Sequence, residues 1–169
     1  MITAGIILAK AAALYDGKNS VQSQSYGPEA RGGASKAEVI ISDSEINYPK
    51  VQTPDILLAL TQAALNKYIH DVKPGGIVII DTMLVKEPPK GDFQVHCVPV
   101  IVSAADVIKA PLSANILALG VLNKLYPSVS GEALERAVAE SIPKAAETNL
   151  KALKLGTELA GKSTACSYN

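Results

Sequence analysis

The segment K-P-G-G-I-V-I-I-D, residues 73–81, constrains the fold more than any other part of the chain. Its apolar residues follow one another without polar alternation, and glycines and Asp81 bound the run. This pattern is typical of a central strand in a parallel sheet that is buried on both faces. Helices must then cover both faces. We therefore expect an α/β fold: a three-layer α/β/α, Rossmann-like domain with a mainly parallel sheet, a mixed sheet being the alternative.

Apolar periodicity and turn residues divide the rest of the chain into further strands and helices. Strands are expected over residues 18–25, 34–42, 55–60 and 93–98. Helices are expected over residues 2–15, 61–71, 103–109, 112–126, 130–141 and 144–159. Gly17 supplies a left-handed end to the first helix, and Ser103 and Ser130 are expected N-caps. Asn115 either caps its helix or presents its amide to a ligand or partner.

The length of 169 residues is that of one domain with a core of its own. We expect residues 1–160 to form this single domain. The small and polar residues 161–169 are expected to form a flexible C-terminal tail.

Charge and hydropathy exclude several classes of partner. Sixteen acidic and sixteen basic residues give no net charge, so attraction to nucleic acid or to anionic membranes is not expected. The sequence contains neither an apolar run long enough to span a membrane nor the features of a signal peptide, which favours a soluble, cytoplasmic protein. Only 19% of the residues are charged, which fits a small subunit whose apolar surface is partly covered by a partner.

The sequence is poor in catalytic and metal-binding patterns. Cys97 and Cys166 are too few for a disulfide framework, a zinc site or an iron–sulfur cluster. His96 has no second histidine or acid at the spacing of metal ligands, so we interpret it as a strand residue. Nucleophile-elbow, zinc-protease and P-loop motifs are absent. A self-sufficient enzyme is therefore not expected.

The stretch from residue 22 to residue 42 is built differently from the rest. It holds a Tyr-Gly-Pro turn, an acid–base pair, a Gly-Gly step and a lysine, without an apolar stripe. One interpretation is a glycine-rich connection with a solvated ion pair. The other is a functional loop, which a second protein would have to hold in place because catalytic geometry needs rigid support.

Four segments together resemble one protein family. They are Q-S-Y-G-P-E-A-R-G-G-A-S-K-A-E-V-I-I-S (24–42), K-P-G-G-I-V-I-I-D-T (73–82), A-N-I-L-A-L-G (114–120) and I-P-K-A-A-E-T-N-L-K-A-L (142–153). In this order they resemble the gamma subunit of 2-oxoacid:ferredoxin oxidoreductases, and the first segment resembles the 2-oxoglutarate (KorC-like) branch. Pyruvate-type gamma subunits usually carry an F-G-x-E-x-R-G-like loop instead.

The resemblance implies oxidative decarboxylation of 2-oxoglutarate to succinyl-CoA with reduction of ferredoxin. It implies a complex that uses thiamine diphosphate, Mg, 4Fe-4S clusters and CoA, none of them held by this chain alone. The implied partners are the alpha, beta and delta subunits, CoA, and ferredoxin through the complex. The chain itself would have a structural, CoA-facing role without a catalytic residue or a metal ligand.

The resemblance also implies which residues face the partners and the CoA route. These candidates are Tyr26, Gly27, Pro28, Glu29, Arg31, Gly32, Gly33, Lys36 and Asn115, with Asn149 of second rank. Arg31 and Lys36 would make charge-assisted contacts to phosphate or to a partner carboxylate. In the family, a strand and a G-x-G-G-Q-G type turn precede the segment that matches residues 1–5. We therefore expect this chain to start after that turn, which puts its contact with CoA in doubt.

Three alternatives stay open. The chain could be a stand-alone α/β module that binds a nucleotide or phosphate ligand. It could be the gamma chain for pyruvate, indolepyruvate or another 2-oxoacid. It could also be a structural homodimer when isolated, because a chain without the first strand would expose a sheet edge.

Overall fold

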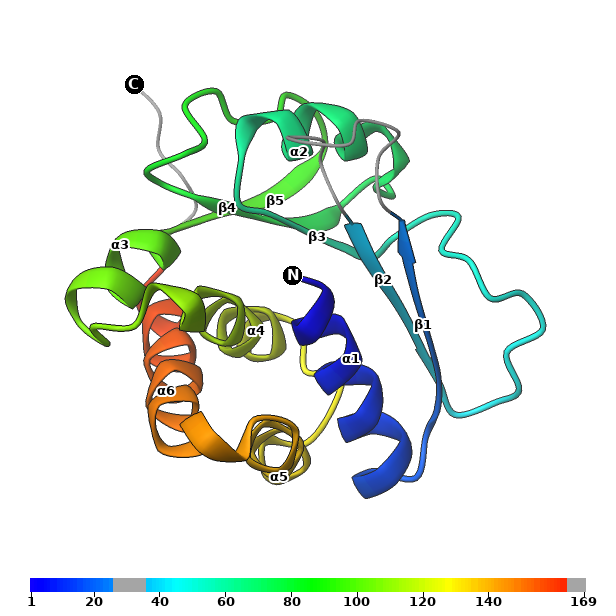
Figure 1. Ribbon diagram of the computed structural model, residues 1–169. Coiled ribbons are helices and arrows are strands. Elements are labelled where there is room, and N and C mark those ends of the chain that lie inside the picture. The colour runs from blue at the N-terminus through cyan, green and yellow to red at the C-terminus, as the bar shows by residue number, and fades with distance from the viewer. Residues whose placement is uncertain (26–35, 164–169) are drawn as a thin grey trace.

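The computed structural model describes residues 1–25 and 36–163, and its strands form two sheets (Figure 1). The first is a parallel sheet of three strands in the order β3–β4–β5, which are Ile56–Ala59, Gly76–Asp81 and Phe93–Val98. The second is an antiparallel pair of β1 (Asn19–Ser25) and β2 (Lys36–Ser42). The helices are α1 (Ile2–Lys10), α2 (Gln62–Tyr68), α3 (Val100–Asp106), α4 (Ala114–Leu125), α5 (Gly131–Ser141) and α6 (Ala146–Lys162).

Strand β4 lies at the centre of the parallel sheet and is buried on both faces. Val78 and Ile80 pack with Leu65 and other residues of the α2 side, whereas Ile79 packs with Leu117 and its neighbours from α4 and α6. Figure 1 shows α2 on one side of this sheet and α4 and α6 on the other. The expected α/β fold with helices on both faces is therefore confirmed. The apolar run predicted it because side chains on successive residues of a strand point to opposite faces.

The antiparallel pair packs against α1. Its register runs from Asn19 opposite Ser42 to Ser25 opposite Lys36. We expected the apolar end of β2 to be buried, but residues 39–41 are only half-buried. Helix α1 packs against β2, but a groove separates β2 from β3, so residues 39–41 stay half-buried.

The first helix and its end follow the sequence prediction. Helix α1 continues as a π-helix over Ala11–Tyr15, and Gly17 then adopts a φ of +65°. The Lys18 N–H donates to the carbonyl of Ala12 at 2.9 Å, which closes the helix end. Glycine is favoured here because side chains disfavour a positive φ.

Helix α3 corrects one prediction. It begins at Val100, after Pro99, so Ser103 lies inside the helix and is buried instead of capping it. The fully buried Asp81, the last residue of β4, supplies the missing acceptor: its Oδ2 accepts a hydrogen bond from the Ile101 N–H at 2.9 Å. A cap from another element leaves no local sequence signal, which is why the helix start was placed too late.

The expected cap at Ser130 is confirmed. Its Oγ accepts from the Ala133 N–H at 3.2 Å, and it donates to Asp16 Oδ1 at 2.7 Å. The second oxygen of Asp16 accepts from the Ser130 N–H at 2.6 Å. The start of α5 is thereby tied to the end of the first helix.

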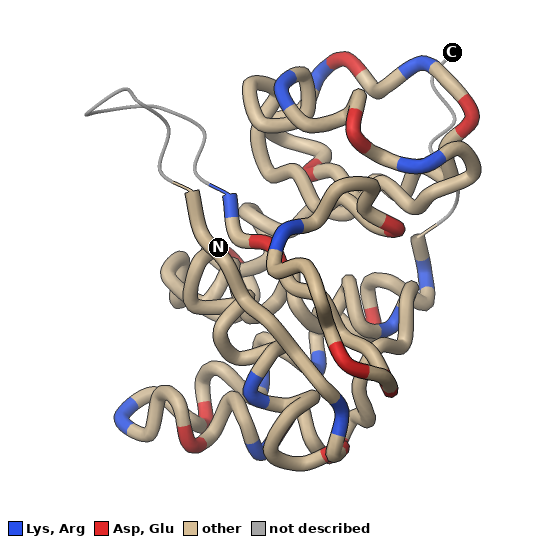
Figure 2. Tube along the Cα trace, turned by 90° about the vertical axis from the view of Figure 1, so that its right-hand side faces the viewer, with Lys and Arg blue, Asp and Glu red and all other residues tan. Residues whose placement is uncertain are grey.

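Short 3-10 turns complete the helical layer, at Ile69–Asp71, Pro111–Ser113 and Pro143–Ala145. Figure 2 shows the positions of the basic and acidic residues interspersed along the coloured part of the trace. Among residues 1–25 and 36–163, no helix is both long and apolar enough to cross a membrane.

Candidate functional site

Most of the expected site lies in the connection between β1 and β2. Residues 26–35 are outside the described part of the chain, and with them seven candidates. These are Tyr26, Gly27, Pro28, Glu29, Arg31, Gly32 and Gly33. The structure fixes the two ends of the connection, because Ser25 and Lys36 are paired across the ladder.

Lys36 is held by neighbours at the first position of β2. Its Nζ donates to Glu38 Oε1 at 2.7 Å, and it lies 5.4 Å from the centre of the Tyr68 ring. Ser23 Oγ, opposite on β1, donates to the second oxygen of Glu38 at 3.2 Å. The side chain of Lys36 is 32% exposed. A phosphate or partner carboxylate would therefore have to share this lysine with Glu38.

Asn115 lies in the first turn of α4, remote in sequence from Lys36. Its Oδ1 accepts from the Ile116 N–H at 2.9 Å. The residue before the helix is Ser113, so Asn115 is not the cap. Asn149, the second-rank candidate, is buried in α6. Neither asparagine is among the described residues that line the groove between β2 and β3.

A groove of about 960 Å³ lies between β2 and β3, which we call the β2–β3 groove. Residues 36–41 of β2 form one wall, and residues 56–58 of β3 form another. Met1 and residues of helix α1 such as Gly5 also line the groove, as do residues of the connection at 48–55. Figure 1 shows the N-terminus beside these two strands. Lys36 is the one candidate among the described residues that the groove includes.

The lining of the groove combines apolar side chains of β2 and β3 with charged side chains. Its lysines are Lys18, Lys36 and Lys50, and its acids include Asp55 and Glu38. Asp55 pairs with Lys73, and this hydrogen bond raises the pKa of Lys73. Lys50 could not be predicted as a groove residue from the sequence, because it lies in an irregular connection whose path depends on tertiary contacts.

Asp81, at the carboxyl end of β4, has a structural role. Asp81 Oδ1 accepts from the Met83 and Leu84 N–H groups at 2.9 and 3.0 Å, while its other oxygen accepts from Ile101. Those bonds occupy the carboxylate. Its position at a strand end made it conspicuous in the sequence, and its contacts explain its burial.

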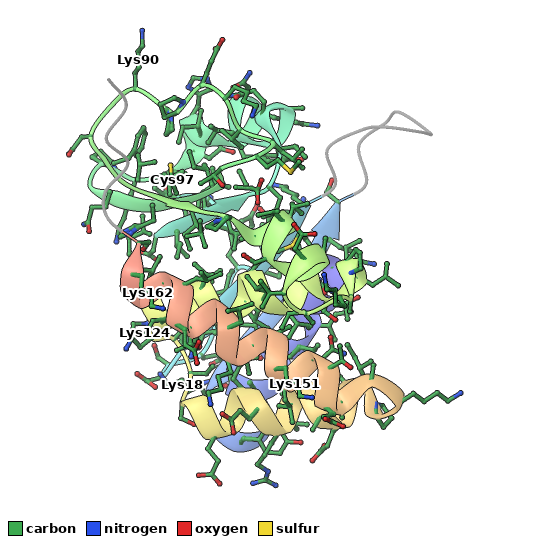
Figure 3. The ribbon with its side chains drawn as sticks, turned by 90° about the vertical axis from the view of Figure 1, so that its left-hand side faces the viewer. Lys18, Lys90, Cys97, Lys124, Lys151 and Lys162 are labelled. Carbon is green, nitrogen blue, oxygen red and sulfur yellow. The ribbon has the colours of Figure 1, made fainter. Side chains whose placement is uncertain are left out.

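The described side chains do not assemble a metal site. Among residues 1–25 and 36–163, no three His, Cys, Asp or Glu side chains could hold an ion together. Burial lowers the pKa of His96, which lies 3.4 Å from Ser163 Oγ through its Nδ1. Figure 3 places Cys97 on the sheet and Lys90 on the connection before β5, pointing away from the sheet.

Comparison with known proteins gives consistent matches. The family described as pyruvate ferredoxin/flavodoxin oxidoreductase matches residues 1–159. The 2-oxoglutarate synthase subunit KorC of Methanocaldococcus jannaschii is 50% identical over 163 residues, which cover 95% of this chain and 87% of that protein. KorC of Methanothermobacter thermautotrophicus is 46% identical over 94% of this chain and 88% of that protein.

A solved structure agrees with the sequence matches. The gamma subunit of keto/oxoacid ferredoxin oxidoreductase from Geobacter sulfurreducens PCA superposes with a TM-score of 0.86 at 48% identity. The superposition covers 95% of this chain and 91% of that one. Both the fold and the sequence of this chain are thus similar to those of subunits of oxidoreductase complexes.

Proposed function

Because this chain belongs to the pyruvate ferredoxin/flavodoxin oxidoreductase family, we propose that it is the gamma subunit of a complex that oxidises 2-oxoglutarate. The reaction releases carbon dioxide, forms succinyl-CoA from CoA, and passes the electrons to ferredoxin. The observation that carries the proposal is the 50% identity to a 2-oxoglutarate synthase subunit over 95% of this chain. Identity at that level over a whole domain supports a shared role as well as a shared fold.

The chemistry of electron transfer belongs to other chains. An iron–sulfur cluster needs a full set of cysteine thiolates, and this chain has only Cys97 and Cys166. The described residues likewise contain no cluster of three His, Cys, Asp or Glu side chains that could hold a magnesium ion. The residues present therefore do not fit either group, and we derive no step through them. The alpha, beta and delta subunits are the proposed carriers.

The proposed role of this chain is to complete the CoA route at a subunit interface. Residues 26–33 would pack against a thiamine-bearing partner, with Arg31 binding a CoA phosphate or a partner carboxylate. The paired ends Ser25 and Lys36 support this, because they fix where the connection leaves the domain. Lys36 would add positive charge there, although Glu38 neutralises part of it.

Purification of the complex tests the proposal. The chain, tagged at its C-terminus, is recovered from extract of its source, and the co-purifying proteins are identified by mass spectrometry. The eluate is assayed for CoA-dependent reduction of a dye by 2-oxoglutarate, with pyruvate as the comparison substrate. Thiamine- and cluster-bearing chains with activity on 2-oxoglutarate would support the subunit. Recovery of the chain alone, binding a nucleotide, would favour the stand-alone module.

Arg31 gives a sharper prediction. Arg31→Ala removes the proposed charge-assisted contact, which contributes roughly 1.5–3 kcal/mol where it is made. We expect about a tenfold or greater loss of CoA-dependent turnover, or of recovered partner subunits, with an unchanged thermal unfolding midpoint of the isolated chain. Lys90→Ala is the matched control, because Lys90 is an exposed cation on the far connection. Equal activity and assembly in both variants would remove Arg31 from the site.

A further inference from the structure

We propose that Cys97 and Cys166 form a disulfide that ties the chain after α6 across the outer edge of β5. This inference concerns an oxidative modification of the chain, goes beyond the proposed function and does not depend on it. It rests on the bonded state of Cys97, on the place where α6 ends, and on the cysteine content of the sequence.

Cys97 is disulfide-bonded in the structure. Within residues 1–25 and 36–163, which the structure describes, no cysteine is free. The sequence contains one other cysteine, Cys166, and it follows closely after the described residues. Within a single chain, Cys166 is therefore the residue that can supply the second sulfur.

Helix α6 ends beside the strand that carries Cys97. Its last residue is Lys162, and Ser163 follows in extended conformation, with φ −69° and ψ 117°. Ser163 Oγ lies 3.4 Å from Nδ1 of His96 and donates to the carbonyl of Ala160 at 2.8 Å. Figure 3 shows the end of α6, labelled at Lys162, below the sheet with Cys97. The chain thus leaves α6 next to the sequence neighbour of Cys97 in β5.

The chain after Ser163 has to pass the outer edge of β5 to reach Cys97. Side chains of successive strand residues point to opposite faces. His96 contacts the end of α6, whereas Cys97 packs with the cluster on the α2 side. The strand order β3–β4–β5 leaves the outer edge of β5 without a strand beside it among the described residues. This edge is at the opposite end of the sheet from the β2–β3 groove.

The distance to be bridged is within reach of Cys166. Three residues beyond Ser163 span up to about 10 Å when extended. The Cα atoms of a disulfide lie a further roughly 5.5–6 Å apart. The chain can therefore cross the edge of one strand and place its sulfur on the face where Cys97 lies.

Formation of the bond is a two-electron oxidation. The two thiols lose their protons, the S–S bond forms, and the electrons pass to a low-molecular-weight disulfide, which is reduced to two thiols. The bond closes a loop that contains α3, α4, α5 and α6, and such a cross-link lowers the entropy of the unfolded chain. It also covers an edge strand, whose unpaired backbone groups are a template for pairing with another chain.

Oxidation of the purified full chain with glutathione disulfide tests the bond. Peptide mapping without reductant should recover the peptide that contains Cys97 joined to the peptide that contains Cys166. The mass of the monomer should fall by that of the two hydrogen atoms lost. Reduction with dithiothreitol should lower the thermal unfolding midpoint by at least about 5 °C, because it removes the constraint on the unfolded chain.

Cys166→Ser separates the disulfide from other effects of the reductant, because it leaves β5 unchanged. Its unfolding midpoint should equal that of the reduced parent chain and should not respond to dithiothreitol. Ser167→Ala is the matched control in the same segment and should keep the full response. Two free thiols after oxidation, glutathione left on either cysteine, or a disulfide that joins two chains would overturn the proposal. Equal midpoints of the oxidised and reduced parent chain would overturn it as well.

Discussion

Asp81 is the residue on which two elements depend. Its carboxylate is fully buried, and it accepts the N–H groups of Met83 and Leu84 after β4 and of Ile101 in α3. The side chain thus ends one strand and begins the helix that follows the next strand. Hydrogen bonds from several backbone N–H groups stabilise a buried carboxylate. Without that carboxylate, the same N–H groups would lose their hydrogen-bond acceptor.

We expect Asp81→Ala to lower the free energy of unfolding by about 3 kcal/mol or more, because it leaves buried backbone donors unpaired. Denaturant titration measures the change. Asp106→Ala, which alters an exposed residue of α3, should stay within about 0.5 kcal/mol of the parent chain. Equal losses in the two variants would contradict the capping role of Asp81.

Glu140 provides a test with pH. Its pKa is lowered from an ordinary value of 4.5, first by the hydrogen bond from Tyr15 and then by that from Lys10. The same contact raises the pKa of Tyr15. Since the folded pKa of Glu140 is depressed, its stabilising contribution is present above pH 4.5 and is lost as the pH falls through the lowered value.

Tyr15→Phe removes the main donor, so the pKa of Glu140 should rise toward its ordinary value. Lys10 remains 3.3 Å from the carboxylate and keeps part of the depression. NMR titration of the side-chain carboxyl carbon measures the shift. Tyr48→Phe, at an exposed tyrosine elsewhere, should leave the titration of Glu140 unchanged. A pKa that does not move in Tyr15→Phe would show that Tyr15 is not the cause.

Single residues were predictable where their signal is local. Ser130 and Gly17 act through neighbours in the sequence, and both were assigned correctly from it. The predicted cap at Ser103 was wrong, because Asp81 of β4 supplies the hydrogen-bond acceptor at the start of α3. Lys36 and Glu38 lie two residues apart on one strand and form an ion pair. The sequence alone did not identify Glu38 as the partner of Lys36.

At the scale of elements, α4 and α6 pack with their backbones in close approach. A Cβ on Gly156 would lie 2.0 Å from the carbonyl oxygen of Leu117, and one on Gly120 would lie 2.2 Å from that of Leu153. The helices can approach so closely only because each offers a glycine to the backbone of the other. The side chains of this layer then pack against the parallel sheet.

Gly156→Ala should therefore destabilise the fold by at least about 1–3 kcal/mol, because neither backbone can yield without moving its helix. Gly161→Ala is the matched control in the same helix. Its added methyl meets nothing within 4 Å, so the better helix propensity of alanine should stabilise the chain by up to about 1 kcal/mol. Thermal unfolding of both variants distinguishes the cases, and equal midpoints would contradict the close packing.

Element types were largely predictable, whereas the contact between α4 and α6 was not. Continuous apolar runs and turn residues placed β4, β5 and α5 close to their observed bounds. The sequence could not show that Gly120 and Gly156 each face the backbone of the other helix, because this depends on how two helices cross. It also did not show that β2 would stay half-buried.

At the scale of the whole molecule, the two sheets differ in how they are supported. The parallel sheet has helices on both faces, while the antiparallel pair is covered by α1 and borders the β2–β3 groove. A two-stranded sheet is marginal unless something packs on it. The antiparallel pair is therefore the part of the described chain expected to open first.

Native-state hydrogen exchange checks this expectation. Amides in the β1–β2 ladder should exchange through local opening, at free energies below that of global unfolding, and those of β4 only through global unfolding. Their responses to low concentrations of denaturant should differ accordingly. Identical exchange free energies for the two ladders would contradict the difference in support.

The position of Met1 has a practical consequence for handling the protein. Met1 lines the β2–β3 groove, so residues of an affinity tag fused ahead of it would start inside that space. Residues fused there would be held beside β2 and β3 at a high effective concentration. Preparations that carry the tag at the N-terminus and at the C-terminus are thus different reagents for any measurement on this part of the molecule.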